Sequence, residues 1–156
     1  FSATGHTHIG GVQGNTLGLD ALRVDEQSAD NLAVVTLTLG GVQIKALPEM
    51  TVAANDRVMV YSSTTFTKGA TAGDINLYLR KVAGTATGVW LDDNTRTIAT
   101  DYFVASRAAA VNLAAMFKVN VGGTLTLELF GDSAGSDSTV AAGEADIHAL
   151  VLRGTG

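Results

Sequence analysis

The chain has 156 residues, of which 46% are hydrophobic, 16% charged and 6% aromatic, and its formal net charge is −5. This length suits a single domain with a core of its own. The ten Lys and Arg residues are scattered, so no basic patch for nucleic acid is expected. The sequence contains no run of about 18 apolar residues, so no membrane-spanning segment is expected. The absence of cysteine excludes disulfides and thiolate metal ligands.

The first 30 residues differ in composition from the rest of the chain. Residues 1–22 are rich in Gly, Thr and His, and the polar stretch at 24–31 (VDEQSADN) is interpreted as a hinge. We therefore divide the chain into a short extended neck, residues 1–30, and a head domain, residues 31–156. A floppy N-terminal tail is the alternative to a neck. Because the chain starts with Phe rather than Met, we expect it to be part of a longer polypeptide.

Apolar and polar residues alternate with a period of two in most of the head, which predicts β-strands. The Gly-rich and polar segments between these runs predict turns. We expect an all-β fold, an antiparallel jelly-roll-like β-sandwich of about eight strands. The alternating or β-rich runs cover residues 35–39, 42–47, 57–65, 75–80, 111–121, 125–129 and 146–153.

One segment gives conflicting signals for strand and helix. Residues 106–118 (SRAAAVNLAAMFK) have a high intrinsic helix propensity. However, every odd position from 111 to 121 is apolar, and Gly122-Gly123 leads into another alternating run. We expect a strand that forms a hairpin with the next one; a helix starting near Ser106 is the alternative.

The last predicted strand, residues 146–153, is apolar on both faces. Ile147, Ala149 and Val151 occupy one face, and Leu150 and Leu152 occupy the other. Such a strand belongs in the centre of a sheet whose second face is covered. The low fraction of charged residues is also typical of chains that bury part of their surface in an oligomer. We therefore expect another subunit to cover the second face.

Two of the three histidines, His6 and His8, lie two positions apart near the start of the chain. In an extended strand their side chains point to the same side, about 7 Å apart. Three chains around a threefold axis would supply six imidazoles, a set that suits octahedral iron or nickel better than zinc. The pair thus predicts a homotrimer with one transition-metal ion per trimer. Two solvated histidines, or the remnant of an expression tag, are the alternatives.

Several segments resemble known trimeric proteins. The strand order, GGTLTLELFG, the loop DSAGSDSTVAAGE and the closing ADIHALVLRG resemble the jelly-roll heads of tumour necrosis factor and complement proteins, over residues 31–153. Such heads also occur on bacteriophage fibres, needles and spikes. TGHTHIGG resembles the Gly-His-x-His segments of phage tail fibres, in which histidines of three chains ligate iron. Those fibres often carry several such pairs, whereas here only His6 and His8 match.

The residues that enzymes use for catalysis form no recognisable pattern here. Neither Gly-x-Ser-x-Gly nor Ser-x-x-Lys is present, and the carboxylates of residues 132–146 match no calcium-binding loop. His148, in the last strand, is expected to be a hydrogen-bonded core or interface residue. We therefore expect no enzyme and no catalytic residues.

Two aromatic residues are candidates for ligand binding. Trp90, the only tryptophan, belongs either to the core or an interface, or to a surface that stacks on a sugar or a receptor. Tyr78 lies on the other face of its strand from the apolar residues at 75, 77 and 79, and is expected to point outward.

The resemblance implies a non-enzymatic protein of the virion surface, a trimeric fibre or spike head that attaches to a host glycan or protein. One alternative is a capsid decoration or head-fibre protein, bound to other virion proteins through the N-terminal segment. A second alternative is a monomeric carbohydrate-binding module with an exposed Trp90 or Tyr78. Nucleic acid is not an expected partner.

Overall fold

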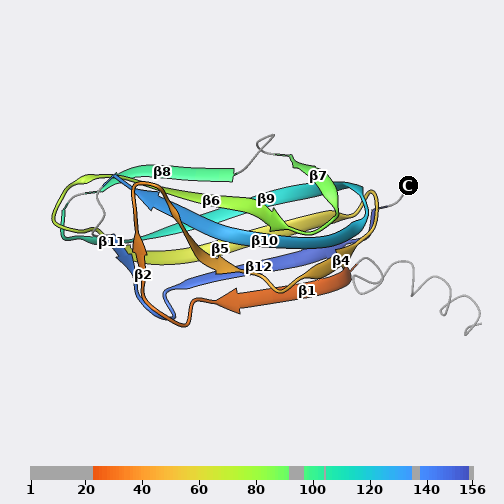
Figure 1. Ribbon diagram of the computed structural model, residues 1–156, viewed down its shortest axis with the longest axis horizontal. Coiled ribbons are helices and arrows are strands. Elements are labelled where there is room, and N and C mark those ends of the chain that lie inside the picture. The colour runs from red at the N-terminus through yellow and green to blue at the C-terminus, as the bar shows by residue number, and fades with distance from the viewer. Residues whose placement is uncertain (1–22, 92–96, 104, 135–137, 155–156) are drawn as a thin grey trace, which may run out of the picture.

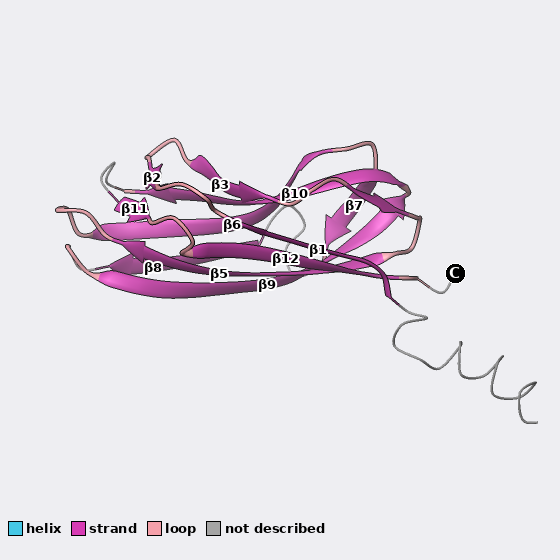
Figure 2. Cartoon of the chain, turned by 90° about the horizontal axis from the view of Figure 1, so that it is seen from below, coloured by secondary structure: helices cyan, strands magenta, loops and turns pink. Residues whose placement is uncertain are grey.

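The computed structural model describes residues 23–91, 97–103, 105–134 and 138–154. Every regular element in these ranges is a β-strand (Figure 2). No helix in this part of the chain is long and apolar enough to cross a membrane. The strands are β1 (Arg23–Asp30), β2 (Val35–Leu37), β3 (Val42–Ala46), β4 (Met50–Val52), β5 (Arg57–Thr67), β6 (Gly73–Ala83), β7 (Thr87–Trp90), β8 (Thr97–Phe103), β9 (Ala108–Val121), β10 (Gly123–Ser133), β11 (Ser138–Val140) and β12 (Ala145–Leu152).

The strands form two antiparallel sheets that pack as the layers of a sandwich (Figures 1 and 2). In the seven-stranded sheet, β1 pairs with β12, β12 with β5, β5 with β9, and β9 with β7, while β11 joins β5 to β2. In the five-stranded sheet, the order is β3-β10-β6-β8, and β4 also pairs with β10. The predicted all-β, jelly-roll-like sandwich is therefore confirmed.

The core lies between the two sheets and is built from one side of each strand. In β5 the buried positions alternate with exposed ones from Val58 to Phe66, and in β10 Leu125, Leu127 and Leu129 are completely buried. Because successive side chains of a strand point to opposite faces, one apolar set from each sheet fills the interior. Fully burying each leucine or valine contributes about 1.5–3 kcal/mol.

The ambiguous segment is a strand. β9 pairs with β5 over eleven consecutive positions, from Arg57 opposite Lys118 to Thr67 opposite Ala108. Leu113, Ala115 and Phe117 are buried on its inner face. Burial of this alternating face and the long ladder outweigh the helix propensity of alanine, since propensity is a weak preference that tertiary packing overrides.

The last strand, β12, is central as expected, because it lies between β1 and β5. The structure changes the interpretation of the preceding polar stretch, however. Residues 24–31 were predicted to form a hinge at the end of a neck, but residues 24–30 belong to β1, which pairs with β12 along its length. A polar strand fits here because β1 is at the edge of the sheet, where charged side chains discourage pairing with other chains. Residues 1–22 lie outside the described residues.

The two ends of the sandwich differ. Arg23, the first residue of β1, lies opposite Leu152, the last residue of β12. The chain therefore enters and leaves the sandwich at the same end (Figures 1 and 2). The β1–β2 connection, residues 31–34, lies at the opposite end. We call these the near end and the far end.

Asn31 holds the far end together. Its side chain is 2% exposed. The amide nitrogen Nδ2 donates hydrogen bonds to the carbonyls of Ala33 (3.0 Å) and Ala141 (2.7 Å), and Oδ1 accepts one from the Ala145 backbone N–H (2.8 Å). One side chain therefore ties the end of β1 to the turn between β11 and β12.

Replacing Asn31 by Ala should lower the free energy of unfolding by about 2–4 kcal/mol, because the buried N–H of Ala145 and two partly buried carbonyls lose their partner. Chemical denaturation followed by circular dichroism measures the change. Asn120→Ala, at an exposed position of β9, is the matched control and should change stability by less than about 0.5 kcal/mol. Equal effects of the two substitutions would contradict this role of Asn31.

Candidate functional site

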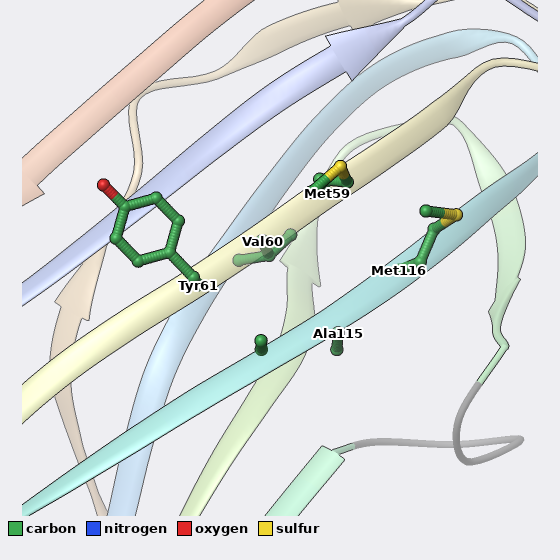
Figure 3. A pocket seen from close by; sticks show the side chains of 6 residues that line it. Met59, Val60, Tyr61, Ala115 and Met116 are labelled. Carbon is green, nitrogen blue, oxygen red and sulfur yellow. The ribbon is translucent and has the colours of Figure 1, made fainter.

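The outer face of the seven-stranded sheet carries large apolar side chains in solvent. On β5, Met59 and Tyr61 alternate with the buried Val58 and Val60 and are 47% and 53% exposed. Figure 3 shows Met59 and Tyr61 on β5 beside Met116 on β9. These side chains surround a shallow pocket, lined by Met59, Val60, Tyr61, Ala114, Ala115 and Met116.

The apolar surface continues across neighbouring strands. Met59 lies opposite Met116 of β9 on one side and opposite Leu150 of β12 on the other. Leu91, directly after β7, donates its backbone N–H to the Met116 carbonyl (2.8 Å) and is 49% exposed. We call Leu91, Met116, Met59 and Leu150 the apolar row. A soluble monomer rarely exposes such a contiguous apolar patch unless the patch is functional.

Charged residues lie at the two sides of the apolar row. Arg57 of β5 lies opposite Lys118 of β9, and we call this pair the basic side. On β1 and β12, Glu26 lies opposite Leu150, and Asp30 lies opposite Asp146. We call Glu26, Asp30 and Asp146 the acidic side. Glu26 thus continues the apolar row onto β1, and Asp30 and Asp146 lie toward the far end. Arg57 and Lys118 lie toward the near end, in the same register as Leu152 and Arg23.

His148 lies on the same face, next to the acidic side. Its ring stacks on Tyr61 with centroids 4.7 Å apart and planes 6° apart. Its Nε2 atom is 3.9 Å from Oδ2 of Asp146, whose other oxygen accepts a hydrogen bond from the Ser63 backbone N–H (2.9 Å). The ring thus extends the apolar surface from Tyr61 onto β12, a position that fits the expected core or interface role.

On the outer face of the five-stranded sheet, a buried carboxylate is held by neighbouring side chains. Glu128, 1% exposed, accepts hydrogen bonds from Arg80 and Gln43. The guanidinium carbon of Arg80 lies 3.4 Å from the ring centroid of Phe130, a cation–π arrangement. Polar groups on this face are therefore held in fixed positions by their neighbours.

Tyr78 lies on that second face, but its environment differs from the expectation. It points to the outer side of β6, yet its side chain is only 8% exposed. Its hydroxyl donates a hydrogen bond to Oδ2 of Asp132 (2.7 Å), and Asn76 donates one to Oδ1 (2.6 Å). The hydroxyl of Tyr78 therefore binds the carboxylate of Asp132. The alternation of apolar and polar residues could not predict this contact.

Trp90 belongs to the core, which was the first of its two predicted roles. The side chain is 3% exposed and meets Phe117 edge-on, with ring centroids 5.2 Å apart. Because Trp90 and Tyr78 are both buried, neither ring has an exposed face on which a sugar could stack. Ligand binding by Trp90 and Tyr78 stays an untested prediction without geometric support.

A buried polar cluster at the far end was not anticipated. Lys68, between β5 and β6, is 1% exposed, and its Nζ atom lies 3.0 Å from Oγ of Ser133 and 3.3 Å from Oγ of Ser138. The two hydroxyl oxygens are 2.9 Å apart. A lysine beside serines can activate a nucleophile. Because both serines are completely buried, a substrate has no access to them, and the cluster joins three segments of the fold.

If Lys68 has a structural role, Lys68→Met and Lys68→Ala should differ in stability. Lys68→Met keeps the volume and leaves the serine pair intact, so stability should stay within about 1 kcal/mol of the original. Lys68→Ala leaves a cavity and should cost about 2–5 kcal/mol. Chemical denaturation of both variants measures the difference. If Lys68→Met is as unstable as Lys68→Ala, the hydrogen bonds rather than the packed volume hold the cluster.

The predicted metal ligands, His6 and His8, lie outside the described residues. Within the ranges that the structure describes, no three His, Cys, Asp or Glu side chains are grouped closely enough to bind a metal ion. The expectation of a metal site therefore continues to depend on the histidine pair alone.

Two solved structures share this arrangement of strands. A chain of the T13 viral particle of infectious bursal disease virus (IBDV) aligns with 83% of this chain and 31% of its own length, at 13% identity and a TM-score of 0.51. The Eiger TNF of S. frugiperda aligns with 86% of this chain and 96% of its own length, at 10% identity and a TM-score of 0.50. At such identities the similarity concerns the fold alone.

No protein-family model matches the chain, and no curated protein matches it in sequence. The chain spans less than a third of the IBDV chain. The comparisons therefore show the fold alone, a jelly-roll-like β-sandwich that a chain of a viral particle and a TNF also have.

Proposed function

We propose that this chain is a non-enzymatic structural protein of a virus particle, a homotrimeric head that attaches the particle to a host surface. The observation that carries the proposal is the apolar row, in which Leu91 and Met59 are exposed and Met116 and Leu150 half-buried, on the outer face of the seven-stranded sheet. A monomer would leave this surface in water, whereas an oligomer buries it. The fold similarity to a chain of a viral particle and to a TNF supports the same proposal.

The side chains that the structure describes also favour a structural role over a catalytic one. Glu128 and Asp132 are engaged by Arg80, Gln43, Asn76 and Tyr78, and the only described lysine–serine cluster is buried. The pocket on the outer face is lined by apolar side chains and carries no nucleophile with a base.

The two ends of the sandwich suggest separate roles. The near end leads to residues 1–22, which we propose as the neck that joins other virion proteins. The far end carries Leu32 and Val34, with exposures of 85% and 63%. Exposed apolar side chains on a loop are typical contacts for a partner surface. We assign the host contact, with a glycan or a protein, to this end.

Attachment to the capsid rather than to a host is the second candidate function. The similarity to a chain of the IBDV particle favours it. In that case the same trimer would decorate the capsid through the N-terminal segment. A carbohydrate-binding module is less well supported, because Trp90 and Tyr78 are buried.

Purified protein should sediment with a mass of three times 16.0 kDa. Elemental analysis should find about one iron or other transition-metal ion per three chains, because six imidazoles complete an octahedral site only in the trimer. The double variant His6→Ala/His8→Ala should lose the metal, whereas His148→Gln should keep it. Since metal binds only the assembled form, its loss should also weaken the trimer. A monomer at micromolar concentration would contradict both the trimer and its metal.

The far-end assignment is tested with Leu32→Asp/Val34→Asp. We expect this variant to bind host cells at least about tenfold more weakly, at unchanged oligomeric mass, because exposed loop residues contribute to contacts and little to folding. Val121→Asp, a similar change at an exposed position of the near end, is the control. Undiminished binding of the double variant, together with retained binding to purified capsids, would favour the decoration function.

A further inference from the structure

We propose that the outer face of the seven-stranded sheet is the contact between copies of this chain, with the basic side of one copy against the acidic side of the next. The inference rests on the homotrimer proposed above and specifies its interface. The occupant of the face is thus a second copy of this chain. Three observations carry the assignment: the composition of the face, the distribution of its charges and the contrast with the opposite face.

The composition of the outer face matches the centre of a protein–protein interface. Such centres are enriched in aromatic residues and Met and depleted of charges, which lie at the rim. Here Met59, Met116 and Tyr61 occupy the centre, and the charged residues lie beside them. The rings of Tyr61 and His148 stack on each other, and side chains that already contact one another lose less entropy on association.

The charges indicate how two copies meet. Arg57 and Lys118 lie on β5 and β9, whereas Glu26, Asp30 and Asp146 lie on β1 and β12, where they outnumber the single Arg23. If two basic sides met, four positive charges would come together. If the basic side of one copy meets the acidic side of the next, each contact pairs opposite charges. Because each copy then uses both sides, the contacts run head-to-tail, the kind of contact from which a closed trimer is built when the rotation between copies is one third of a turn.

The five-stranded sheet also exposes one large apolar side chain, Val82 of β6 at 47%, but its outer face is otherwise built differently. Its aromatic and charged side chains satisfy one another, as in the pairs of Arg80 with Phe130 and Tyr78 with Asp132. A partner that covered it would have to desolvate groups that already have their hydrogen bonds. The two faces therefore differ in a way that selects the seven-stranded sheet for contact between copies.

Charge reversal tests the pairing directly. Arg57→Glu/Lys118→Glu makes both sides acidic, and Glu26→Lys/Asp30→Lys makes both sides basic. Each variant alone should raise the concentration at which the trimer dissociates by about tenfold or more, because like charges then face each other. The combination of all four substitutions restores opposite charges at every contact and should restore the trimer. Sedimentation velocity in buffer of low ionic strength measures each mass.

The control is Lys45→Glu/Lys81→Glu, which makes an equal change of charge on β3 and β6 of the other sheet and should leave the trimer intact. Circular dichroism of every variant verifies the fold. If the wild type is monomeric, the proposed homotrimer is wrong and this interface with it. If the wild type is a trimer and both reversals remain trimers, the homotrimer stands and this interface is wrong. If both reversals dissociate and the four-residue variant does not reassemble, the opposite-charge pairing is overturned.

Discussion

The ladder between β5 and β9 is the constraint on which the rest of the structure depends. Eleven consecutive residue pairs fix which side chains of each strand face inward. The register that places the buried Val58 and Val60 beside Phe117 and Ala115 also places the exposed Met59 beside the half-buried Met116 on the outer face. A shift of one residue would exchange the two faces and expose the core. The stable interior and the exposed apolar surface are therefore two results of one pairing.

Much of this architecture could be predicted from the period-two alternation alone. It identified the strand at 111–121 against a strong helix propensity, and it placed the last strand in the centre of a sheet. Its two apolar faces, with Leu150 on the second, already indicated that something covers the sheet. The stretch at 57–65 also has apolar residues on both faces, since Met59 and Tyr61 lie on one face of the strand and Val58 and Val60 on the other. This two-faced pattern is weaker than in the last strand, because serines follow at 62 and 63.

What the sequence could not reveal depends on contacts between distant segments. Lys68 meets Ser133 and Ser138, which lie 65 and 70 positions away, and no local pattern marks such a meeting. Tyr78 was expected to be outward from its parity, but parity does not show that Asp132 and Phe130 of the adjacent strand bury it. Residues 24–31 were predicted to form a hinge because they are polar. An edge strand of a sheet also needs few apolar residues, so composition does not distinguish the two.

The pairing of β1 with β12 places the first and last described strands side by side, and Asn31 connects to Ala145 across 114 positions. The seven-stranded sheet therefore stays incomplete at one edge until β12 has left the ribosome. Contacts between residues so far apart in sequence form slowly, since a long loop must close first. β1, although it is made first among the described strands, therefore gains its only partner strand last. The edge of the seven-stranded sheet is thus closed by the longest-range pairing in this part of the chain.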